Sequence, residues 1–493
     1  MTHTMSTMSS RGNAAAWGAQ MRWHRFFVLL ILSGFTLVAG CSGMKTVGPP
    51  PLPANVQVSL TLTDTPPVGV TVVSFSATII GAALNPRGSL EASVALVSTP
   101  TKIEIKQLET EAAFLATASV PPGTYNSITV AFANPELTFK NDTASRLVGC
   151  NPAQVCQIKP LAAGSITFVS APFPVTIIGN TPTGFTVDVN LANLITGTLG
   201  VNFTVANALT VLQLPLPGQP VGQLQEIEGL IGVVASKGAT LNQFTLQTVK
   251  GNFTATVDSS TVFDAFVTCP AANFTCVQNL QVVEADLKLL ASGLFVARRI
   301  EFEDNAADDE LEGIVTSVDT LTQFKMVVVD QLRAVSGVAV GNPVTVSLQT
   351  NPSFQVDTLG LTVPSGLLGS FQGAIDTSQL MPGQNVLVRV RSLTGSLPQP
   401  IVVSTDRVRL RVSRFTASVG SVTPPTLFDV NNLPQLFQTA LVTQVQALVV
   451  PQTRFDGVTD INSLAAGNTV SLRGLLFTAP PNTVLIADKV RKR

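Results

Sequence analysis

Short stretches in which apolar and polar residues alternate make up most of the chain after residue 55. Alternation with a period of two indicates half-buried β-strands, because successive side chains of a strand point to opposite faces of a sheet. In the first third of the chain these stretches lie at Val56–Leu60, Val70–Ile80, Ile103–Lys106, Ser127–Phe132 and Phe185–Leu191. So many short strands in succession predict that residues 55–215 form an antiparallel β-sandwich of two sheets.

From Glu226 onward the strand pattern repeats three times. Gly232–Ser236 is echoed 81 residues later by Gly313–Ser317, and a third copy opens at Val419–Val422. Each copy continues with an alternating strand and closes on a strand with basic residues, and five short strands suit a small Greek-key barrel. We therefore predict an all-β protein, an N-terminal antiparallel β-sandwich followed by three small five-stranded OB-like β-barrel repeats. The repeats are expected as separate units in series, at residues 226–304, 311–412 and 415–493.

One apolar run does not fit the strand pattern. A basic flank ending at Arg25 precedes the apolar run Phe26–Ala39, and small residues then lead to Cys41. About 14 apolar residues are too few for a membrane span, which needs about 20. The pattern predicts a lipoprotein signal peptide at residues 1–40, with Cys41 lipidated and anchoring the protein to a membrane.

Processing at Cys41 would place the protein outside the cytoplasm. We expect translation to begin at Met21, which leaves a compact signal of ordinary length. Residues 41–54, with three consecutive prolines, would form an extended lipidated tether. In a Gram-negative host we favour the outer membrane, because Ser42 stands where an aspartate would favour retention in the inner membrane.

Removal of the signal changes the chemistry that the chain can perform. Both histidines and both tryptophans lie before Cys41, and Tyr125 is the single tyrosine. Histidine is the usual general base and the commonest metal ligand. Catalysis by Ser-His-Asp or Cys-His groups and HExxH zinc sites are therefore excluded for the mature chain. We expect no cofactor, no metal ligand and no catalytic residue.

The charge balance argues against nucleic acid as a partner. The mature chain has 26 basic and 30 acidic residues, because the signal contains three arginines and no acid. Proteins that bind nucleic acid neutralise phosphates with an excess of lysine and arginine, and no such excess is present. The partners that we expect are the membrane, through the lipid, and a protein or a polysaccharide.

Four cysteines remain after Cys41, in two close pairs. They are Cys150 with Cys156 and Cys269 with Cys276, and an exported protein meets oxidising conditions. We predict two local disulfides, each closing a short loop. A thiol-active or metal-binding pair is the alternative, although neither pair has the CxxC spacing.

The first region resembles a known family. The residues that carry the resemblance are the SLTLTD strand at Ser59–Asp64, the strand Ile103–Leu108, the PPGTY turn ending at Tyr125 and the TVDVNL strand ending at Leu191. Together they resemble the domain-of-unknown-function family 4382. That family occurs in bacterial lipoproteins and has a predicted β-sandwich domain, and it has no established catalytic residues.

The repeats resemble a second family, the domain-of-unknown-function family 5666. Glu312–Val318, Gly383–Val388 and Ala487–Val490 carry this resemblance, and the middle copy matches best. The first copy departs from the pattern by its Cys269–Cys276 loop, and the third by prolines directly after its first strand. This family also has no assigned chemistry.

Several recurring side chains could form sites. Six phenylalanines could offer a stacking surface, but we expect them to fill the barrels: Phe244, Phe263, Phe324, Phe354, Phe455 and Phe477. The closing strands have basic residues that could bind an anion, but we expect solvated faces: Arg298, Arg299, Arg407, Arg409, Lys489 and Arg491. Four recurring aspartates are expected in turns: Asp258, Asp264, Asp319 and Asp456. The acidic run Asp304–Glu310 is expected as a solvated linker; a calcium loop is the alternative, although its glycine turn is missing.

Two classes of function remain. The first is a non-enzymatic cell-envelope lipoprotein with a binding or scaffolding role. The second is an enzyme that acts on a polymer or carbohydrate with paired carboxylates, which needs two acids about 5–10 Å apart in a cleft. We expect the first. A structure with facing buried carboxylates in a groove would favour the second.

Overall fold

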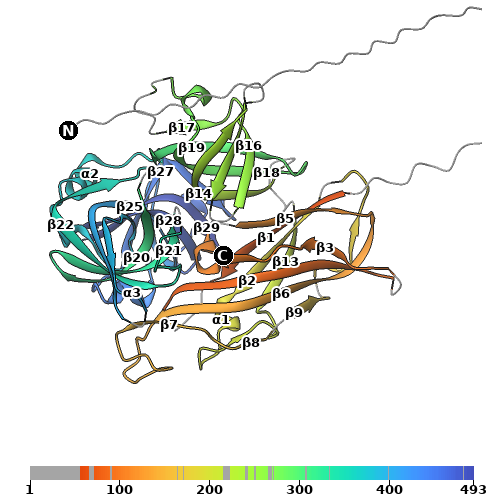
Figure 1. The fold of residues 1–493 in the computed structure, drawn as a ribbon, viewed down its shortest axis with the longest axis horizontal. Helices are drawn as coiled ribbons and strands as arrows, with labels where there is room; N and C mark the ends of the chain where they lie inside the picture. Colours follow the sequence, from red (N-terminus) through yellow and green to blue (C-terminus); the bar gives the residue numbers. More distant parts are fainter. Residues whose placement is uncertain are drawn as a thin grey trace, which may run out of the picture. The chain divides into compact units, whose positions relative to one another are not determined.

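The structure is a computed structural model of the chain. It describes residues 56–493 except 66–70, 89–90, 111, 164, 170, 182, 215–222, 239–241, 249–250, 265–268, 270, 306–307, 332–333, 398 and 481. Strands dominate the described residues, so the all-β prediction is confirmed (Figure 1). The described helices are α1 (Leu191–Leu194), α2 (Ser365–Gln372) and α3 (Gln435–Gln438), with 3-10 turns η1 (Ile105–Glu109), η2 (Phe274–Cys276), η3 (Thr377–Gln379) and η4 (Ile461–Ser463). None of these helices is long and apolar enough to cross a membrane.

The first region consists of two sheets that share one apolar core. One sheet has the order β13-β11-β1-β5, formed by β1 (Val56–Thr65), β5 (Ala113–Val120), β11 (Thr183–Asn190) and β13 (Leu209–Leu214). The other has β10, β6, β2 and β3 in order, with β4, β7 and β9 at its sides: β2 (Thr71–Pro86), β3 (Val94–Val97), β4 (Thr101–Glu104), β6 (Gly123–Lys140), β7 (Val155–Ile158), β9 (Ser165–Phe168) and β10 (Val175–Ile177). A small parallel pair, β8 (Ala162–Ala163) with β12 (Val201–Asn202), lies beside them.

Alternating residues of both sheets meet in this core, where Leu60, Phe75, Phe139 and Phe185 are fully buried. The sandwich is not wholly antiparallel, because β1 pairs with β11 in parallel. Between β1 and β11 the chain passes through the other sheet, and β11 then runs in the same direction as β1. Two strands joined by a hairpin would instead run in opposite directions.

The strands of the first repeat pair into a closed ring. They are β14 (Gln223–Lys237), β15 (Gln243–Thr248), β16 (Gly251–Thr256), β17 (Val262–Asp264), β18 (Gln281–Leu290) and β19 (Phe295–Asn305). The pairings run β14-β15-β16-β19-β18 and return to β14, and the β16–β19 pair is parallel. We call this the first ring.

Two further rings follow with the same order of pairing. The second is formed by β20 (Glu310–Thr320), β21 (Gln323–Gln331), β22 (Pro343–Val356), β23 (Asn385–Arg389) and the first half of β25 (Ile401–Thr423), and β24 (Ser392–Thr394) pairs with β25. The third is formed by the second half of β25 with β26 (Leu427–Asn431), β27 (Val445–Asp456), β28 (Thr469–Ala479) and β29 (Asn482–Lys492). Three rings of five strands each are what OB-like repeats require.

The second and third rings are not separate units. β25 is continuous, so the predicted boundary at residues 412–415 falls inside a strand: Val408 pairs with β22 and β23, and Val412 already pairs with Leu475 of β28. Phe477 of the third ring also packs in the same apolar cluster as Phe324 of the second. The expectation of units joined only in series is therefore wrong here, because two rings share both a strand and a core.

Most of the recurrent phenylalanines lie inside the rings, as predicted. Phe244, Phe324, Phe354 and Phe477 are between 0 and 3% exposed, while Phe263 and Phe455 are half-buried. Strand residues on either side of Phe244, Phe324 and Phe354 point outward. Phe477 differs, because its neighbour Leu476 packs in the core of the third ring while Phe477 packs against the second ring. The outward faces of several strands carry charged residues, and these form the first candidate site.

Candidate functional site

Charged residues occupy alternate positions on three strands of the first ring. On β14 they are Glu226 and Glu228; on β18, Glu284 and Asp286; on β19, Arg299, Glu301 and Glu303. The residues between them, such as Ile227, Ala285 and Ile300, belong to the apolar core of the ring. Residues two apart on a strand share a face, so these charges lie on the outside of the ring. Except for the half-buried Glu226 they are nevertheless buried, because the other rings cover this face.

The charges that cover this face are basic and come from the later rings. Alternate residues of β25 supply Arg407, Arg409 and Arg411, while the third ring supplies Arg454, Arg473 and Lys489. Arg473 is 1% exposed and Arg411 is 3% exposed. The prediction that the basic residues of the closing strands form solvated faces is therefore wrong: Arg299, Arg407 and Lys489 are buried and paired with acids.

Arg411 is the centre of the first group of ion pairs. Its guanidinium contacts Glu284 of β18, Glu303 of β19 at 2.7 Å, and Asp357, which follows β22. One oxygen from each of these carboxylates lies within 4.8 Å of the others, a spacing that could suit a metal ion. Arg411 donates hydrogen bonds to all three. The three acids thus already have a cation between them, the guanidinium of Arg411.

Glu228 is the centre of a second group. Its carboxylate accepts hydrogen bonds from Arg454, from Arg473 at 2.8 Å and from Lys489 at 3.2 Å. Arg473 also contacts Asp488 at 2.8 Å. Burial raises the pKa of Glu228, but the three cations outweigh it and hold this pKa well below its usual range. Glu228 is therefore ionised throughout the physiological pH range.

A third group joins the start of β20 to β25. Arg407 contacts Glu310, and Arg389 contacts Asp308 at 3.1 Å and Asp406 at 2.8 Å. Glu310 is 3% exposed. The acidic run ending at Glu310 is therefore not simply a solvated linker, because its last residues are held by arginines.

Two carboxyl groups near these ion pairs have raised pKa values, in contrast to Glu228. Burial raises the pKa of Glu301 to about 8; Arg299 opposes the shift, while neighbouring Glu303 and Glu284 add to it. Burial likewise raises the pKa of Glu104 to about 7, against the backbone N–H of Phe75 and the hydroxyl of Ser74, which donate to it. Raised carboxyl pKa values are a property of general acids, so these residues must be weighed as catalytic candidates.

A small cavity brings Glu104 near the ion pairs. It has a volume of about 60 Å³ and its lining includes Glu104, Glu228, Glu284, Glu312 and Arg411. Buried carboxylates thus gather around one space, which is the feature expected of an enzyme with paired acids. That space holds about four water molecules, whereas pockets for small organic ligands have volumes of about 300–1,000 Å³.

A much larger groove lies elsewhere. It has a volume of about 1200 Å³, and its lining comes from three places: the end of the Cys150–Cys156 loop with β7, the second ring, and the segment around Thr439–Val442 of the third ring. Its lining includes Lys140 and Lys325 and no aspartate or glutamate. The groove is large enough for a large ligand, but its lining has no carboxylate that could act in catalysis.

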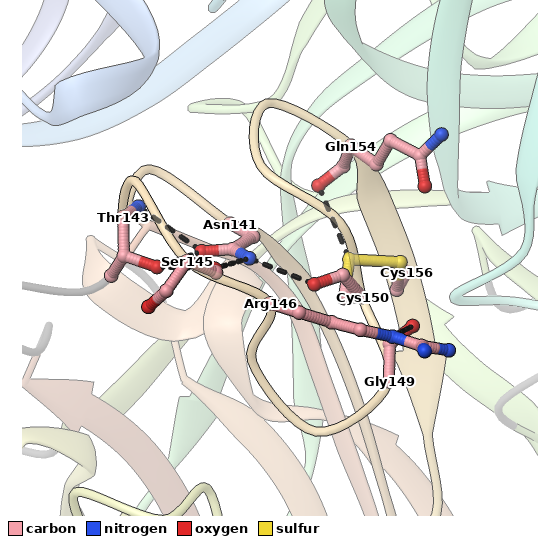
Figure 2. Close-up of a disulfide and its surroundings, with 8 residues drawn as sticks. All are labelled: Asn141, Thr143, Ser145, Arg146, Gly149, Cys150, Gln154 and Cys156. Atoms are coloured by element: carbon pink, nitrogen blue, oxygen red, sulfur yellow. Dashed lines mark hydrogen bonds between the residues drawn. A yellow bond between two sulfur atoms is a disulfide. The ribbon is translucent and has the colours of Figure 1, made fainter.

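The Cys150–Cys156 loop forms one wall of this groove. The disulfides join Cys150 to Cys156 and Cys269 to Cys276, which are the pairs that the spacing predicts. Figure 2 shows Asn141 in the segment that leads into this loop: its amide donates to the backbone oxygens of Ser145 and Cys150, both at 2.9 Å, and its side-chain oxygen accepts from the backbone N–H of Thr143. The side chain and the disulfide together hold the loop in one conformation.

The remaining candidates from the sequence have structural roles or lie outside the described residues. Asp258 accepts from Ser260 in a turn, as expected, and Asp319 contacts Lys325 at 2.9 Å. Asp456 contacts Arg491 at 2.6 Å, and Asp264 is the last residue of β17, where it pairs with Glu301 of β19. Cys41 lies outside the part of the chain that the structure describes.

Sequence reasoning missed the acidic partners of the basic strands. The signal was present: acids alternate at Glu226 and Glu228 and again at Glu301 and Glu303, and arginines alternate at Arg407, Arg409 and Arg411. Opposite charges with the same strand period in different repeats indicate strand faces that can meet.

Comparison with known proteins concerns the first region. Residues 55–204 match the family described as a domain of unknown function, DUF4382. The match covers the sandwich up to its last strand, β13, and confirms the first of the two resemblances. No curated protein and no solved structure matches the chain.

Proposed function

We propose that the protein is a non-enzymatic lipoprotein of the cell envelope that binds or holds a partner. The observation that supports this best is the contrast between the two spaces. The carboxylates meet around a cavity with room only for water, and the groove with room for a large ligand has no carboxylate in its lining. A binding role needs only the groove.

The lipid anchor is part of the proposal. Its support is the sequence from Arg22 to Cys41, together with two disulfides, which suit an oxidising compartment. The anchor would place the protein on a membrane, with the outer membrane favoured in a Gram-negative host. A relation of the three rings to the domain-of-unknown-function family 5666 is also proposed, and their shared order of strand pairing is consistent with it.

The enzyme alternative has two observations in its favour, the buried carboxylates that line the small cavity and the raised pKa of Glu104 among them. A sugar ring does not fit in a space for about four waters, so the alternative requires the rings to separate before a substrate can enter. A polysaccharide hydrolase activity that disappears in Glu104→Gln would overturn the non-enzymatic part of the proposal.

The anchor predicts that Cys41→Ser abolishes lipid attachment. In cells fed labelled palmitate we expect the wild-type protein to carry the label and to sediment with membranes, and globomycin to block its maturation. Cys41→Ser should carry no label and should leave the mature membrane pool. Ser42→Ala, which keeps the cysteine, is the matched control and should behave as the wild type. Label on the Cys41→Ser protein would show that the lipid is attached at another residue, and a wild-type protein without label would show that it has no lipid anchor.

A further inference from the structure

One wall of the groove beside the Cys150–Cys156 loop is a strand edge to which another polypeptide strand can be added. Five consecutive residues, Ala153–Gln157, line it. Since successive side chains of a strand point to opposite faces, a space that touches every residue in a row runs along the edge of the strand. Among the described residues, β7 pairs with β6 alone, so its second edge has backbone groups with no strand partner. Of these residues Val155, Cys156 and Gln157 belong to β7, and the free edge of this four-residue strand is about 13 Å long.

The opposite wall belongs to the second ring and has an apolar base. Val344, Met381 and Ile401 line it and are at most 3% exposed. At the rim, Val318 is 37% and Leu397 48% exposed, and Leu441, between the lining residues Ala440 and Val442, is 89% exposed. Exposed apolar residues beside a groove are typical of a surface that a partner covers.

The charge of the lining favours an acidic ligand. Lys140 and Lys325 are its charged residues, and their ammonium groups contact Asp142 at 2.8 Å and Asp319 at 2.9 Å, two acids that do not line the groove. Lys325 remains 53% exposed at its side chain and can turn toward a ligand. Opposite charge across an interface raises the rate of association and selects the partner.

We propose that this groove binds an extended, acidic segment of another polypeptide, which pairs with the free edge of β7 and places apolar side chains against the second ring. The proposal rests on the binding function above and names the class of its partner. Addition of a strand to an exposed edge gives affinity through backbone hydrogen bonds, while pockets for alternate side chains give specificity. The lining has no aromatic residue on which a sugar could stack, so the groove suits a peptide better than an oligosaccharide.

The test measures binding of a defined peptide to the full mature chain in detergent micelles. The probe is a fluorescein-labelled seven-residue peptide of alternating glutamate and valine, followed by fluorescence anisotropy. We expect saturable binding, and an increase in Kd of about tenfold or more in Lys325→Glu and in Leu397→Asp. The same peptide with N-methyl groups on every second residue should not bind, because it cannot pair with a strand edge. A peptide of alternating lysine and valine should bind more weakly than the acidic one.

The chain offers a matched control for each variant. Lys102 is 43% exposed at its side chain and pairs with Glu136 at 2.6 Å, much as Lys325 pairs with Asp319, but it does not line the groove. Leu294 is 57% exposed, close to the value for Leu397, and lies at the first ring. Lys102→Glu and Leu294→Asp should leave the Kd unchanged.

Three results would overturn the proposal. They are no binding of the acidic peptide, equal loss of binding in the groove variants and their controls, and binding of an oligogalacturonate at the groove in place of the peptide. The last would assign the groove to a polysaccharide. None of these bears on lipidation at Cys41, so the anchor and the groove can fail separately.

Discussion

Glu301 shows how the buried face of the first ring affects a single side chain. The carboxyl group lies 3.2 Å from Arg299, yet burial and the neighbouring Glu303 and Glu284 raise its pKa to about 8. An unfolded glutamate has a pKa near 4.5. Between these two values the folded protein holds a proton on Glu301 that the unfolded chain has released.

The pH dependence of Glu301→Gln follows from that difference. Because the folded state binds the extra proton, the free energy of unfolding falls as pH rises from about 4.5 to 8. Glutamine resembles the protonated acid and does not titrate. We expect Glu301→Gln to melt at the same temperature as the wild type at pH 5 and a few degrees higher at pH 8.5, measured by circular dichroism. A difference of equal size at both pH values would contradict the raised pKa.

The burial of individual charged residues was the part that the sequence could not predict. The alternation at Arg407, Arg409 and Arg411 places these side chains on one face of a strand, and that much is predictable. Whether water or another ring covers the face depends on residues more than 90 positions away, as with Arg407 and Glu310. The local pattern therefore correctly predicted that the three arginines share one face of the strand, but it wrongly predicted that water covers this face.

At the scale of elements, the first strand of the first ring and that of the second ring each need a glycine where they approach the second strand. A β-carbon on Gly313 would lie 2.8 Å from the backbone oxygen of Val327, and one on Gly232 would lie 2.6 Å from that of Gln247. This explains why the repeat is visible at these two positions. In the second ring the backbone of Val315 exchanges hydrogen bonds with the turn before β23, and in the third ring the backbone of Val419 does the same with the turn before β28. Val419 is therefore the counterpart of Val315, and Ala417, two residues earlier, is the counterpart of Gly313. Gly420, which marks the third copy in the sequence, is not its counterpart.

Gly313→Ala should therefore destabilise the protein. We expect a loss of about 1–3 kcal/mol in the free energy of unfolding, because the backbone of β21 must move away. Gly366, in the exposed first turn of α2, has nothing within 4 Å of an added β-carbon. Gly366→Ala should be neutral or stabilising, since alanine favours a helix. Urea denaturation of both variants tests this, and equal effects would show that the contact at Val327 relaxes freely.

The positions of the strands and the existence of the repeat were predictable because each can be recognised from short stretches of sequence. The alternation in β1, β6 and β11 and the echo of Gly232–Ser236 in Gly313–Ser317 are local signals. The continuity of β25 was not predictable in the same way. Nothing in residues 412–415 distinguishes a strand that passes from one ring to the next from two strands joined by a short linker.

At the scale of the whole molecule, complementary faces hold the first ring against the other two. Arg411 alone contacts acids from β18, β19 and the segment after β22. Burial of ions costs solvation free energy, and only good pairing offsets it. Loss of Arg411 would leave its three acids buried without a counter-charge. An arrangement of the rings that separates Arg411 from these acids carries the same cost, so the ion pairs favour the observed arrangement.

Arg411→Met should accordingly destabilise the protein by about 3–5 kcal/mol and increase hydrogen exchange in β18 and β19. Arg391 is the matched control, because it also contacts two acids, Asp308 and Asp406, but its side chain is 37% exposed. Arg391→Met should cost at most about 1 kcal/mol. Urea denaturation and hydrogen exchange measured by mass spectrometry provide the comparison. Similar costs for the two variants would show that the buried pairs do not hold the rings together.

The order of charges along the chain has a consequence for synthesis. Acids of the first ring are made long before their partners in the later rings: 127 residues separate Glu284 from Arg411, and 245 separate Glu228 from Arg473. Within the first ring, Arg298 and Arg299 neutralise only part of this acidic face. While the chain grows, the acidic face therefore stays hydrated and negatively charged, which discourages association with a second nascent copy bearing the same charge. Contact of the first ring with the second becomes favourable once Arg411 has been made, and contact with the third once Arg473 has been made. A product truncated before Arg411 therefore retains an exposed acidic face that the finished protein buries.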